Sequence, residues 1–193
     1  MENKGGISIK PVDKDNWVDF EAFFQSQGKL NYCWCMCWRL SKGEKDELKQ
    51  NDSACRKAFI KRRVWENTPV GILGYAQKEA VAWCSIAPRE THRPLGGDGG
   101  IKNVWSITCF YIKNGYRRQG LMKTLIEGAK NYAAQNGTHY IEAYPVEKDS
   151  PSYRFMGFIK TFEEAGFSFV KTAGKRRHVM VHKMSALSGG AAI

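Results

Sequence analysis

A strand–loop–helix–strand segment in the second half of the chain constrains the fold most strongly. Residues 104–112 form a continuous apolar run, which is typical of a strand buried on both faces. After a short turn, apolar residues recur at helical spacing over 121–133, and residues 140–146 predict a second strand. Two strands joined by a helix of about 15 residues lie parallel in one sheet. The sequence therefore predicts a βαβ unit, and with it an α/β fold.

The N-terminal third predicts a strand followed by two helices. Residues 7–9 alternate as in a short strand. Aromatic residues at helical spacing over 17–24 predict a helix that Asp13 or Asp15 caps. Asp52 lies in a second cap signal, which predicts another helix after it.

Hairpins and a loop complete the predicted order of elements. Residues 70–87 predict one hairpin, and residues 167–184 predict another after a last helix that ends at Gly166. The Gly- and Pro-containing segment 89–102 is expected to be a mobile loop that could cover a substrate. His92 lies in this loop and is expected to be a surface or strand-face histidine and not a catalyst.

The size and charge of the chain limit its organisation and partners. A chain of 193 residues suits one domain, so we expect a domain over 1–184 and a flexible tail over 185–193. It has neither a membrane-spanning apolar run nor the apolar core of a secretory signal, so we expect a cytoplasmic protein. The net charge of +11 attracts phosphates. Because the basic residues are spread along the chain, nucleic acid is not expected as the partner.

The loop between the first parallel strand and its helix predicts a phosphate site. A helix N-terminus presents about four unpaired N–H groups to an anion. Gly120 allows close approach of the backbone, and Arg117 and Arg118 add charged donors. The loop matches neither a Walker A motif nor a Rossmann fingerprint. A basic turn with a glycine for geometry alone is the alternative, but the flanking βαβ unit favours phosphate binding.

This loop resembles the Arg/Gln-x-x-Gly-x-Gly/Ala loop of the GNAT superfamily, the GCN5-related N-acetyltransferases. Arg117 takes its first position and Gly120 its first glycine, whereas Met122 replaces the usual final Gly or Ala. The element order over nearly the whole chain is similar, and residues 163–167 resemble the end of the family's last helix. The resemblance implies a single GNAT-fold α/β domain, with a mixed central sheet, a splayed parallel strand pair and flanking helices.

The same resemblance implies acetyl-CoA as the co-substrate of an N-acetyltransferase. The acetyl group would move to an amine of a small molecule or peptide by direct attack in a ternary complex. Because the chain is positively charged, acidic or neutral amines are favoured over polycations. The strand would bind the pantetheine arm and the loop the pyrophosphate, through Cys109, Phe110, Tyr111, Ile112, Arg117, Arg118, Gln119, Gly120, Leu121, Met122 and Thr124.

Three residues are candidates for catalysis. Glu142 and Tyr144 alternate on one face of the second parallel strand, which makes Glu142 a candidate base. A glutamate at the strand end that faces solvent or pairs with a lysine is the alternative. The tyrosine that the family often uses as an acid is replaced here by Phe162. Tyr153, at the same spacing from an earlier Gly-Phe pair, and Tyr144 are the candidate acids, and a packing role stays open for both.

The segment Tyr32-Cys33-Trp34-Cys35-Met36-Cys37-Trp38-Arg39 is unusual. If it were extended, the three cysteines would share one face and could hold a soft metal or metalloid. A closed zinc site needs four ligands, so no metal is assigned and a buried apolar wall is favoured. The segment is similar to one in a bacterial GNAT subgroup. A non-catalytic GNAT-fold module that binds CoA, or a metalloid through its thiols, is the alternative to an enzyme, and a homodimer stays open.

Overall fold

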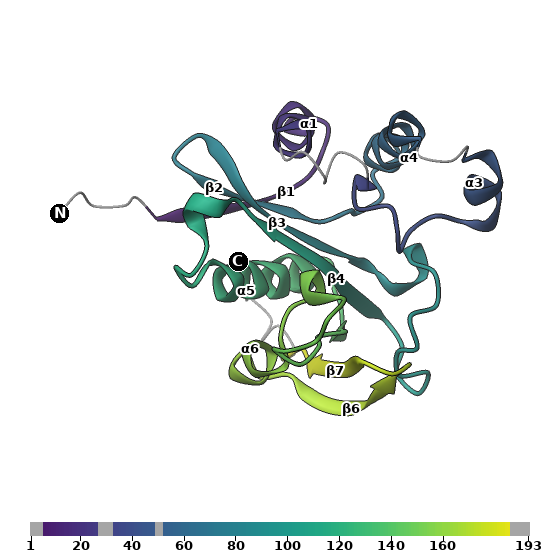
Figure 1. The fold of residues 1–193 in the computed structure, drawn as a ribbon, viewed down its shortest axis with the longest axis vertical. Helices are drawn as coiled ribbons and strands as arrows, with labels where there is room; N and C mark the ends of the chain where they lie inside the picture. The colour runs from purple at the N-terminus through teal and green to yellow at the C-terminus, as the bar shows by residue number, and fades with distance from the viewer. Residues whose placement is uncertain (1–5, 27–32, 49–51, 186–193) are drawn as a thin grey trace, which may run out of the picture.

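The computed structural model describes residues 6–26, 33–48 and 52–185. In these residues one mixed sheet has seven strands in the order β1-β2-β3-β4-β5-β7-β6 (Figure 1). The strands are β1 Ile7–Pro11, β2 Ile72–Ala76, β3 Glu79–Pro88, β4 Val104–Ile112, β5 Tyr140–Ala143, β6 Ser168–Ala173 and β7 Arg177–Lys183. Of these strands only β4 and β5 pair in parallel; the other neighbours are antiparallel. The predicted βαβ unit and both predicted hairpins are confirmed.

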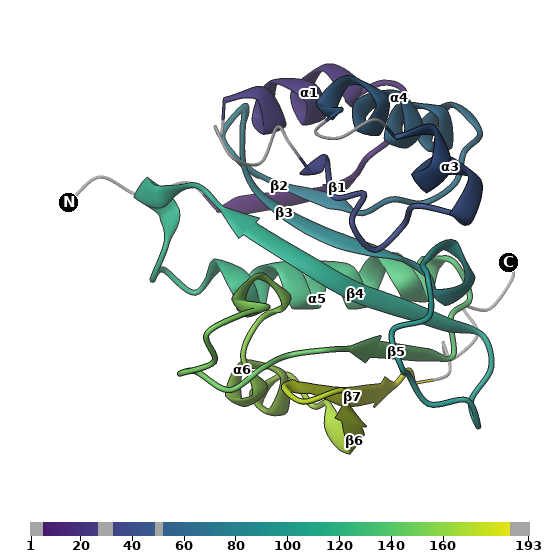
Figure 2. The same cartoon turned by 45° about the vertical axis from the view of Figure 1, so that its right-hand side comes forward.

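Helices cover both faces of this sheet. The described helices are α1 Trp17–Gln25, α3 Lys42–Glu47, α4 Ser53–Trp65, α5 Leu121–Gln135 and α6 Ile159–Glu164, with 3-10 turns η1 Arg89–Thr91, η2 Asn114–Tyr116 and η3 Arg154–Met156. Figure 2 shows α1, α3 and α4 over one face and α5 against the other. None of the described helices is long and apolar enough to cross a membrane.

Each face of the sheet has its own core. The α1 face is aromatic: Phe20, Phe24 and Trp83 pack edge to face or tilted within 5.7 Å of one another. The α5 face combines aliphatic residues with fewer aromatic ones, and Leu125 and Ile126 of the helix are buried there against the strands. Burial of this apolar surface from both sides stabilises the central strands.

Three details differ from the sequence-based expectation. The first helix begins after Asn16, because the Asp13 carboxylate accepts N–H groups in the preceding turn instead of capping the helix. The second parallel strand ends at Ala143, not at residue 146. The segment 89–102 is also packed in part, since His92 and Leu95 are only 8% and 5% exposed. Of the predicted tail 185–193, only Ser185 belongs to the described residues, so that boundary stays a prediction.

The cysteine segment is not extended. Trp34 and Cys35 have positive φ angles of 47° and 54°, so the chain turns there. The thiols of Cys33 and Cys37 hydrogen-bond each other, whereas Cys35 accepts the indole N–H of Trp83 at 2.9 Å. The extended segment that would align the three thiols on one face is therefore absent, and no group of three side chains that could hold a metal ion lies together among the described residues. The buried apolar wall is confirmed, as Trp34, Met36 and Trp38 are all buried.

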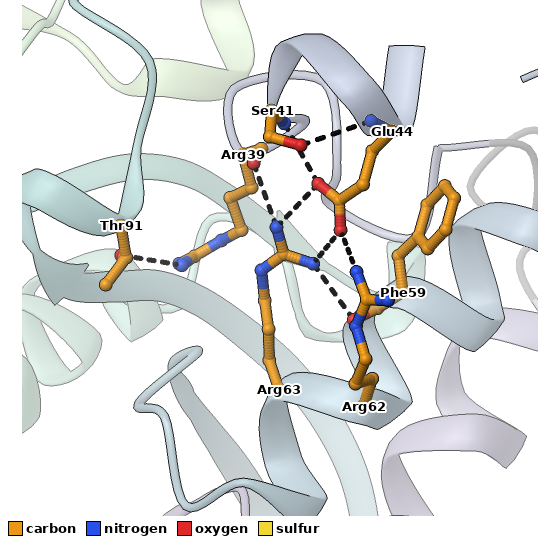
Figure 3. A network of polar contacts seen from close by, with 7 residues as sticks. All are labelled: Arg39, Ser41, Glu44, Phe59, Arg62, Arg63 and Thr91. Atoms are coloured by element: carbon orange, nitrogen blue, oxygen red, sulfur yellow. Dashed lines mark hydrogen bonds and ion pairs between the residues drawn. The ribbon is translucent and has the colours of Figure 1, made fainter. Parts of the chain in front are cut away.

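A buried ion network anchors the end of this segment (Figure 3). Glu44 accepts hydrogen bonds from Arg62 and, through both carboxylate oxygens, from Arg63 at 2.7–2.9 Å. Ser41 and Glu44 also form a reciprocal capping box at the start of α3. Arg63 donates to the backbone carbonyl of Arg39, and the Arg39 guanidinium reaches Thr91. The network therefore joins α3, α4 and the loop after β3, and it fixes the chain next to Trp38.

Replacing Glu44 should reveal how much this network contributes. Burial by itself raises the pKa of Glu44, but hydrogen bonds from Arg63 and Ser41 outweigh it and lower the pKa to about 2. A carboxylate whose pKa is lower in the folded protein than in the unfolded chain stabilises the fold at every pH above the unfolded value. For Glu44 this stabilisation is lost as the pH falls from about 4.5 towards 2. We expect Glu44→Gln to lower the free energy of unfolding by about 3 kcal/mol at pH 7.

Denaturant unfolding of both proteins between pH 7 and pH 3 measures this difference. The difference in free energy of unfolding between the wild type and Glu44→Gln should become smaller as the pH falls. Glu47→Gln is the control, because Glu47 lies on the same helix and is exposed. A difference in unfolding free energy that does not change with pH would contradict the lowered pKa of Glu44.

Candidate functional site

The two parallel strands separate halfway along β4. Their pairing ends at Ile107 and Ala143, although β4 continues to Ile112. Thr108 is an extra residue at this point: the register against β3 shifts there, so no residue of β3 lies opposite it, although its hydroxyl hydrogen-bonds to that of Ser85. Such β-bulges bend a strand and often lie beside active sites. Beyond Ala143 the chain turns away, and Val146 pairs with Phe158 instead. The predicted splay is therefore present, at the level of Thr108.

The separation leaves one edge of β4 open. From Cys109 to Ile112, β4 pairs with β3 on one side only, because β5 has already ended. A free strand edge presents backbone N–H and C=O groups that can pair with an extended ligand.

The loop after β4 forms a concave row of backbone donors. Arg118 and Gly120 have left-handed backbones, with φ of 61° and 80°. In the described part of the chain, the N–H groups of residues 118–122 have no acceptor, whereas those of Lys123 and Thr124 bond to the carbonyl of Gly120. Alternating backbone conformations that aim successive N–H groups at one point form an anion site, and the start of α5 adds positive partial charge.

A cavity of about 650 Å³ connects the loop with the separated strands. This volume is in the range of small-molecule sites. Most of the predicted cofactor-binding residues line it, together with residues of η3 and α6. The lining residues are Phe110, Tyr111, Ile112, Arg117, Arg118, Gly120, Leu121, Met122, Lys123, Arg154, Phe155, Phe158 and Thr161.

Three predicted residues do not line this cavity. The side chain of Cys109 packs into the core under α1. The side chain of Gln119 turns back to donate to the carbonyl of Gly115 at 2.9 Å. Thr124 is exposed and lines a separate cavity beside Ile9, because helical rotation carries its side chain away from the loop. Thr124 therefore does not line this cavity, and a contact between its side chain and a pyrophosphate stays a prediction.

Sequence reasoning missed the wall formed by η3 and α6. Arg154 and Phe155 follow the candidate acid directly, and Phe158 ends the same Gly-Phe match. Their proximity to Tyr153 was the available signal. The bridge between Val146 and Phe158, which places this wall opposite β4, is a long-range contact that no local pattern shows.

Glu142 is the centre of a buried polar cluster at the point of separation. Its side chain is fully buried and accepts from Tyr144 at 2.5 Å and from Ser106 at 2.7 Å. Arg89 donates to both carboxylate oxygens, at 2.8 and 2.5 Å. The solvent-facing or lysine-paired glutamate considered from the sequence is therefore wrong. A carboxylate with this many donors is held in a fixed position.

The two candidate tyrosines differ in environment. Tyr144 is 1% exposed, and burial together with the charge of Glu142 raises its pKa. Tyr153 is 36% exposed and has a left-handed backbone with φ of 61°. No hydrogen bond within the described residues engages its hydroxyl. The next two residues line the cavity, while the Tyr153 ring lies 6.1 Å from the Trp38 ring. Tyr153 itself does not line the cavity, but it adjoins two residues that do, and its ring lies near Trp38.

His92 lies behind the bulge. Its Nε2 is 3.5 Å from the hydroxyl of Thr108, and its Nδ1 is 3.3 Å from the carbonyl of Pro88. Burial lowers the pKa of His92 well below its usual value, so the ring is neutral at pH 7. The surface position expected for this histidine is wrong.

Comparison with known proteins identifies the family. The sequence model of the Acetyltransferase (GNAT) family matches residues 20–158, which is most of the chain. The chain belongs to the GNAT family of acetyltransferases. A search of curated proteins found no significant match.

Solved structures share the whole fold. The protein yncA of Salmonella typhimurium, solved with its cofactor acetyl-CoA, has a TM-score of 0.59 at 15% identity, over 98% of this chain and all of that one. The PaiA N-acetyltransferase of Thermoplasma acidophilum, in complex with coenzyme A, has a TM-score of 0.55 at 15% identity, over 93% of this chain and 99% of that one. The ribosomal-protein-S18-alanine N-acetyltransferase of Escherichia coli has a TM-score of 0.54 at 11% identity, over 97% of this chain and all of that one. At these identities the likeness shows a shared GNAT fold.

A methyl group at Gly97 should disturb the Glu142 cluster. A Cβ there would lie 2.8 Å from the Tyr144 hydroxyl and even closer to a carboxylate oxygen of Glu142. Because donors hold Glu142 on several sides, it cannot move aside freely. We expect Gly97→Ala to lower the free energy of unfolding by about 1–3 kcal/mol. Gly99→Ala is the matched control, since a methyl group at Gly99 would meet open space. Equal stability of the two variants in denaturant unfolding would contradict this packing.

Proposed function

We propose that this protein transfers an acetyl group from acetyl-CoA to an amine of a small molecule or peptide. The observation that supports this most directly is the row of unpaired N–H groups at residues 118–122, which opens onto the cavity beside the separated strands. A pyrophosphate matches that row in charge and in acceptor number. The chain belongs to a family of acetyltransferases, and two proteins of the same fold hold acetyl-CoA or coenzyme A.

The cofactor would lie across three elements. Its pyrophosphate would rest on the loop before α5, where Arg117 and Arg118 contribute positive charge. Its pantetheine amides would pair with the open edge of β4 from Cys109 to Ile112. This path leads the thioester to Thr108, where the strands separate. Cys109 and Gln119 would then contribute through their backbones, because their side chains point elsewhere.

The chemistry needs few protein groups once the two substrates are positioned. The neutral amine attacks the thioester carbonyl carbon and forms a tetrahedral intermediate in the ternary complex. Its collapse breaks the carbon–sulfur bond, and the electron pair leaves on the CoA thiolate. A base or water accepts the proton that the amine loses, and an acid protonates the thiolate. Holding the reactants together accounts for much of the rate of such a transfer.

Tyr153 is the better candidate for the acid. Within the described residues its hydroxyl is not engaged, and its neighbours Arg154 and Phe155 line the cofactor cavity. Tyr144 instead donates to Glu142, and its raised pKa weakens it as an acid. In this proposal Glu142 positions Tyr144 and Arg89, and water accepts the proton of the amine.

The cofactor assignment is tested by a charge at Gly120. We expect acetyl-CoA at a hundredfold excess over its Kd to stabilise the wild type by about 2.7 kcal/mol. CoA should also stabilise it, whereas NAD and ATP should have less effect. Gly120→Glu should abolish the stabilisation, because its carboxylate would lie where the pyrophosphate binds. Thermal unfolding with each compound measures this.

Gly137→Glu is the matched control for this experiment. Gly137 also has a left-handed backbone, with φ of 68°, and open space around its Cα, but it lies at the other end of α5. This variant should keep the response to acetyl-CoA. A well-folded wild type that acetyl-CoA does not stabilise would sink the proposal. Binding without release of free thiol to any amine would favour a non-catalytic CoA-binding module.

The role of Tyr153 is tested by removing its hydroxyl. We expect Tyr153→Phe to lower kcat by about 100-fold or more, with the Kd of acetyl-CoA unchanged. Tyr144→Phe should affect stability more than kcat, because it removes a buried hydrogen bond to Glu142. Thiol release measured across pH checks both variants. Full activity of Tyr153→Phe would show that Tyr153 is not the acid.

A further inference from the structure

A cluster of arginines and aromatic rings surrounds Trp38 on the side of Tyr153 away from the cofactor cavity. The Arg93 guanidinium lies 4.4 Å from the centre of the Trp38 ring, and the Arg177 guanidinium lies 5.3 Å from it. Arg177 also lies 5.8 Å from the Tyr144 ring and 5.6 Å from the Tyr153 ring. Four segments distant in sequence thus bring two cations and three aromatic rings together.

Neither arginine has an acidic partner in the part of the chain that the structure describes. Arg93 and Arg177 form no ion pair there, although other arginines do, such as Arg63 with Glu44. The buried carboxylate of Glu142 is already bound by Arg89. The cluster therefore retains a positive charge that the described part of the protein does not neutralise.

Two buried donors in this cluster also lack acceptors. In the described residues, the indole Nε1 of Trp38 and the Nη1 of Arg177 are buried without a hydrogen-bond partner. Trp38 as a whole is only 8% exposed. Two other buried indoles are paired: that of Trp34 donates to Ser53 at 2.9 Å, and that of Trp83 donates to Cys35. A buried unpaired donor is unfavourable unless a ligand supplies the acceptor.

The position of the cluster relates it to the reaction. Tyr144 follows β5 directly where the parallel strands separate, and Tyr153 is the proposed acid. Arg177 begins β7, which pairs with β5. A ligand group held between Arg177 and Trp38 would therefore lie close to the thioester but outside the cofactor cavity, in the place that the second substrate must occupy.

We infer that the acceptor is an amine that also bears a carboxylate, and that Arg177, Arg93 and Trp38 bind this carboxylate. The inference rests on the proposed function and names its substrate class. A planar guanidinium binds a carboxylate through two parallel hydrogen bonds, and Trp38 supplies a further donor. The aromatic rings can pack against an apolar part of the same molecule. A polyamine does not fit this site, because the two arginines repel added positive charge.

The binding of a carboxylate probe tests this inference without turnover. Phenylacetate would be titrated into the full chain saturated with CoA and followed by ligand-observed NMR, with uncharged phenylacetamide as the comparison. We expect Arg177→Gln and Trp38→Phe to weaken the binding of phenylacetate about tenfold or more. Trp38→Phe keeps a six-membered aromatic ring and removes the five-membered ring that carries the unpaired donor, and thermal unfolding without ligand checks that the variant keeps the fold. Arg176→Gln is the control, because Arg176 is exposed and bonds to Ser152.

Three outcomes of that titration would overturn the inference. The first is that phenylacetate does not bind the wild type, and the second is that it binds the wild type and both variants equally. Phenylacetamide should bind more weakly than phenylacetate, and equal binding of the two probes would also contradict a site for a charged group.

Acetyl transfer then separates this inference from the proposed function. Thiol release would be compared for phenylalanine and for phenethylamine, which lacks the carboxylate. We expect a higher kcat/KM for phenylalanine, and a rise in its KM in Arg177→Gln with phenethylamine unaffected. If acetyl-CoA binds and both amines react equally well, the carboxylate site is wrong and the acetyltransferase proposal stands. If acetyl-CoA fails to stabilise the protein, the proposed function itself fails.

Discussion

The separation of β4 from β5 is the constraint on which the rest of the site depends. The two strands pair only as far as Ile107 and Ala143, and Thr108 bulges out of register with β3 at the same level. Because β5 ends there, β4 keeps an open edge, and the segment from Tyr144 to Phe158 turns aside to form the opposite wall. The cavity, the donor loop before α5 and the polar cluster around Glu142 are all arranged about this gap.

Two buried ion networks keep the surroundings of the gap in place. Glu142 binds Arg89 and Tyr144, while Glu44 binds Arg62 and Arg63, and Arg63 also donates to the backbone carbonyl of Arg39, next to Trp38 (Figure 3). Removing one member of such a network leaves buried charge without a partner, which costs more than the hydrogen bonds themselves. These networks therefore position the residues near the reaction, and they need not take part in it.

The two sides of the gap differ in how they would recognise a ligand. The cofactor side offers mainly backbone donors, from the edge of β4 and the start of α5, so its geometry follows from the fold. The proposed acceptor side would use side chains instead: Trp38, Arg177 and Tyr153 come from separate segments. Substitutions there can change the acceptor without altering the cofactor site, and fold similarity to proteins of low identity therefore does not name the substrate.

The sequence by itself determined the βαβ unit, the hairpins and the position of the basic, glycine-containing loop before α5. Each depends on local signals: the apolar run of β4, the helical period of α5 and the Arg117–Gly120 spacing. Only the tertiary structure decided that Thr124 lines a separate cavity beside Ile9, that Arg89 forms an ion pair with Glu142, and that the Arg177 guanidinium lies over the Trp38 ring. The last two are contacts between residues far apart in the chain, and they arise from strand pairing and loop packing, which no local pattern specifies.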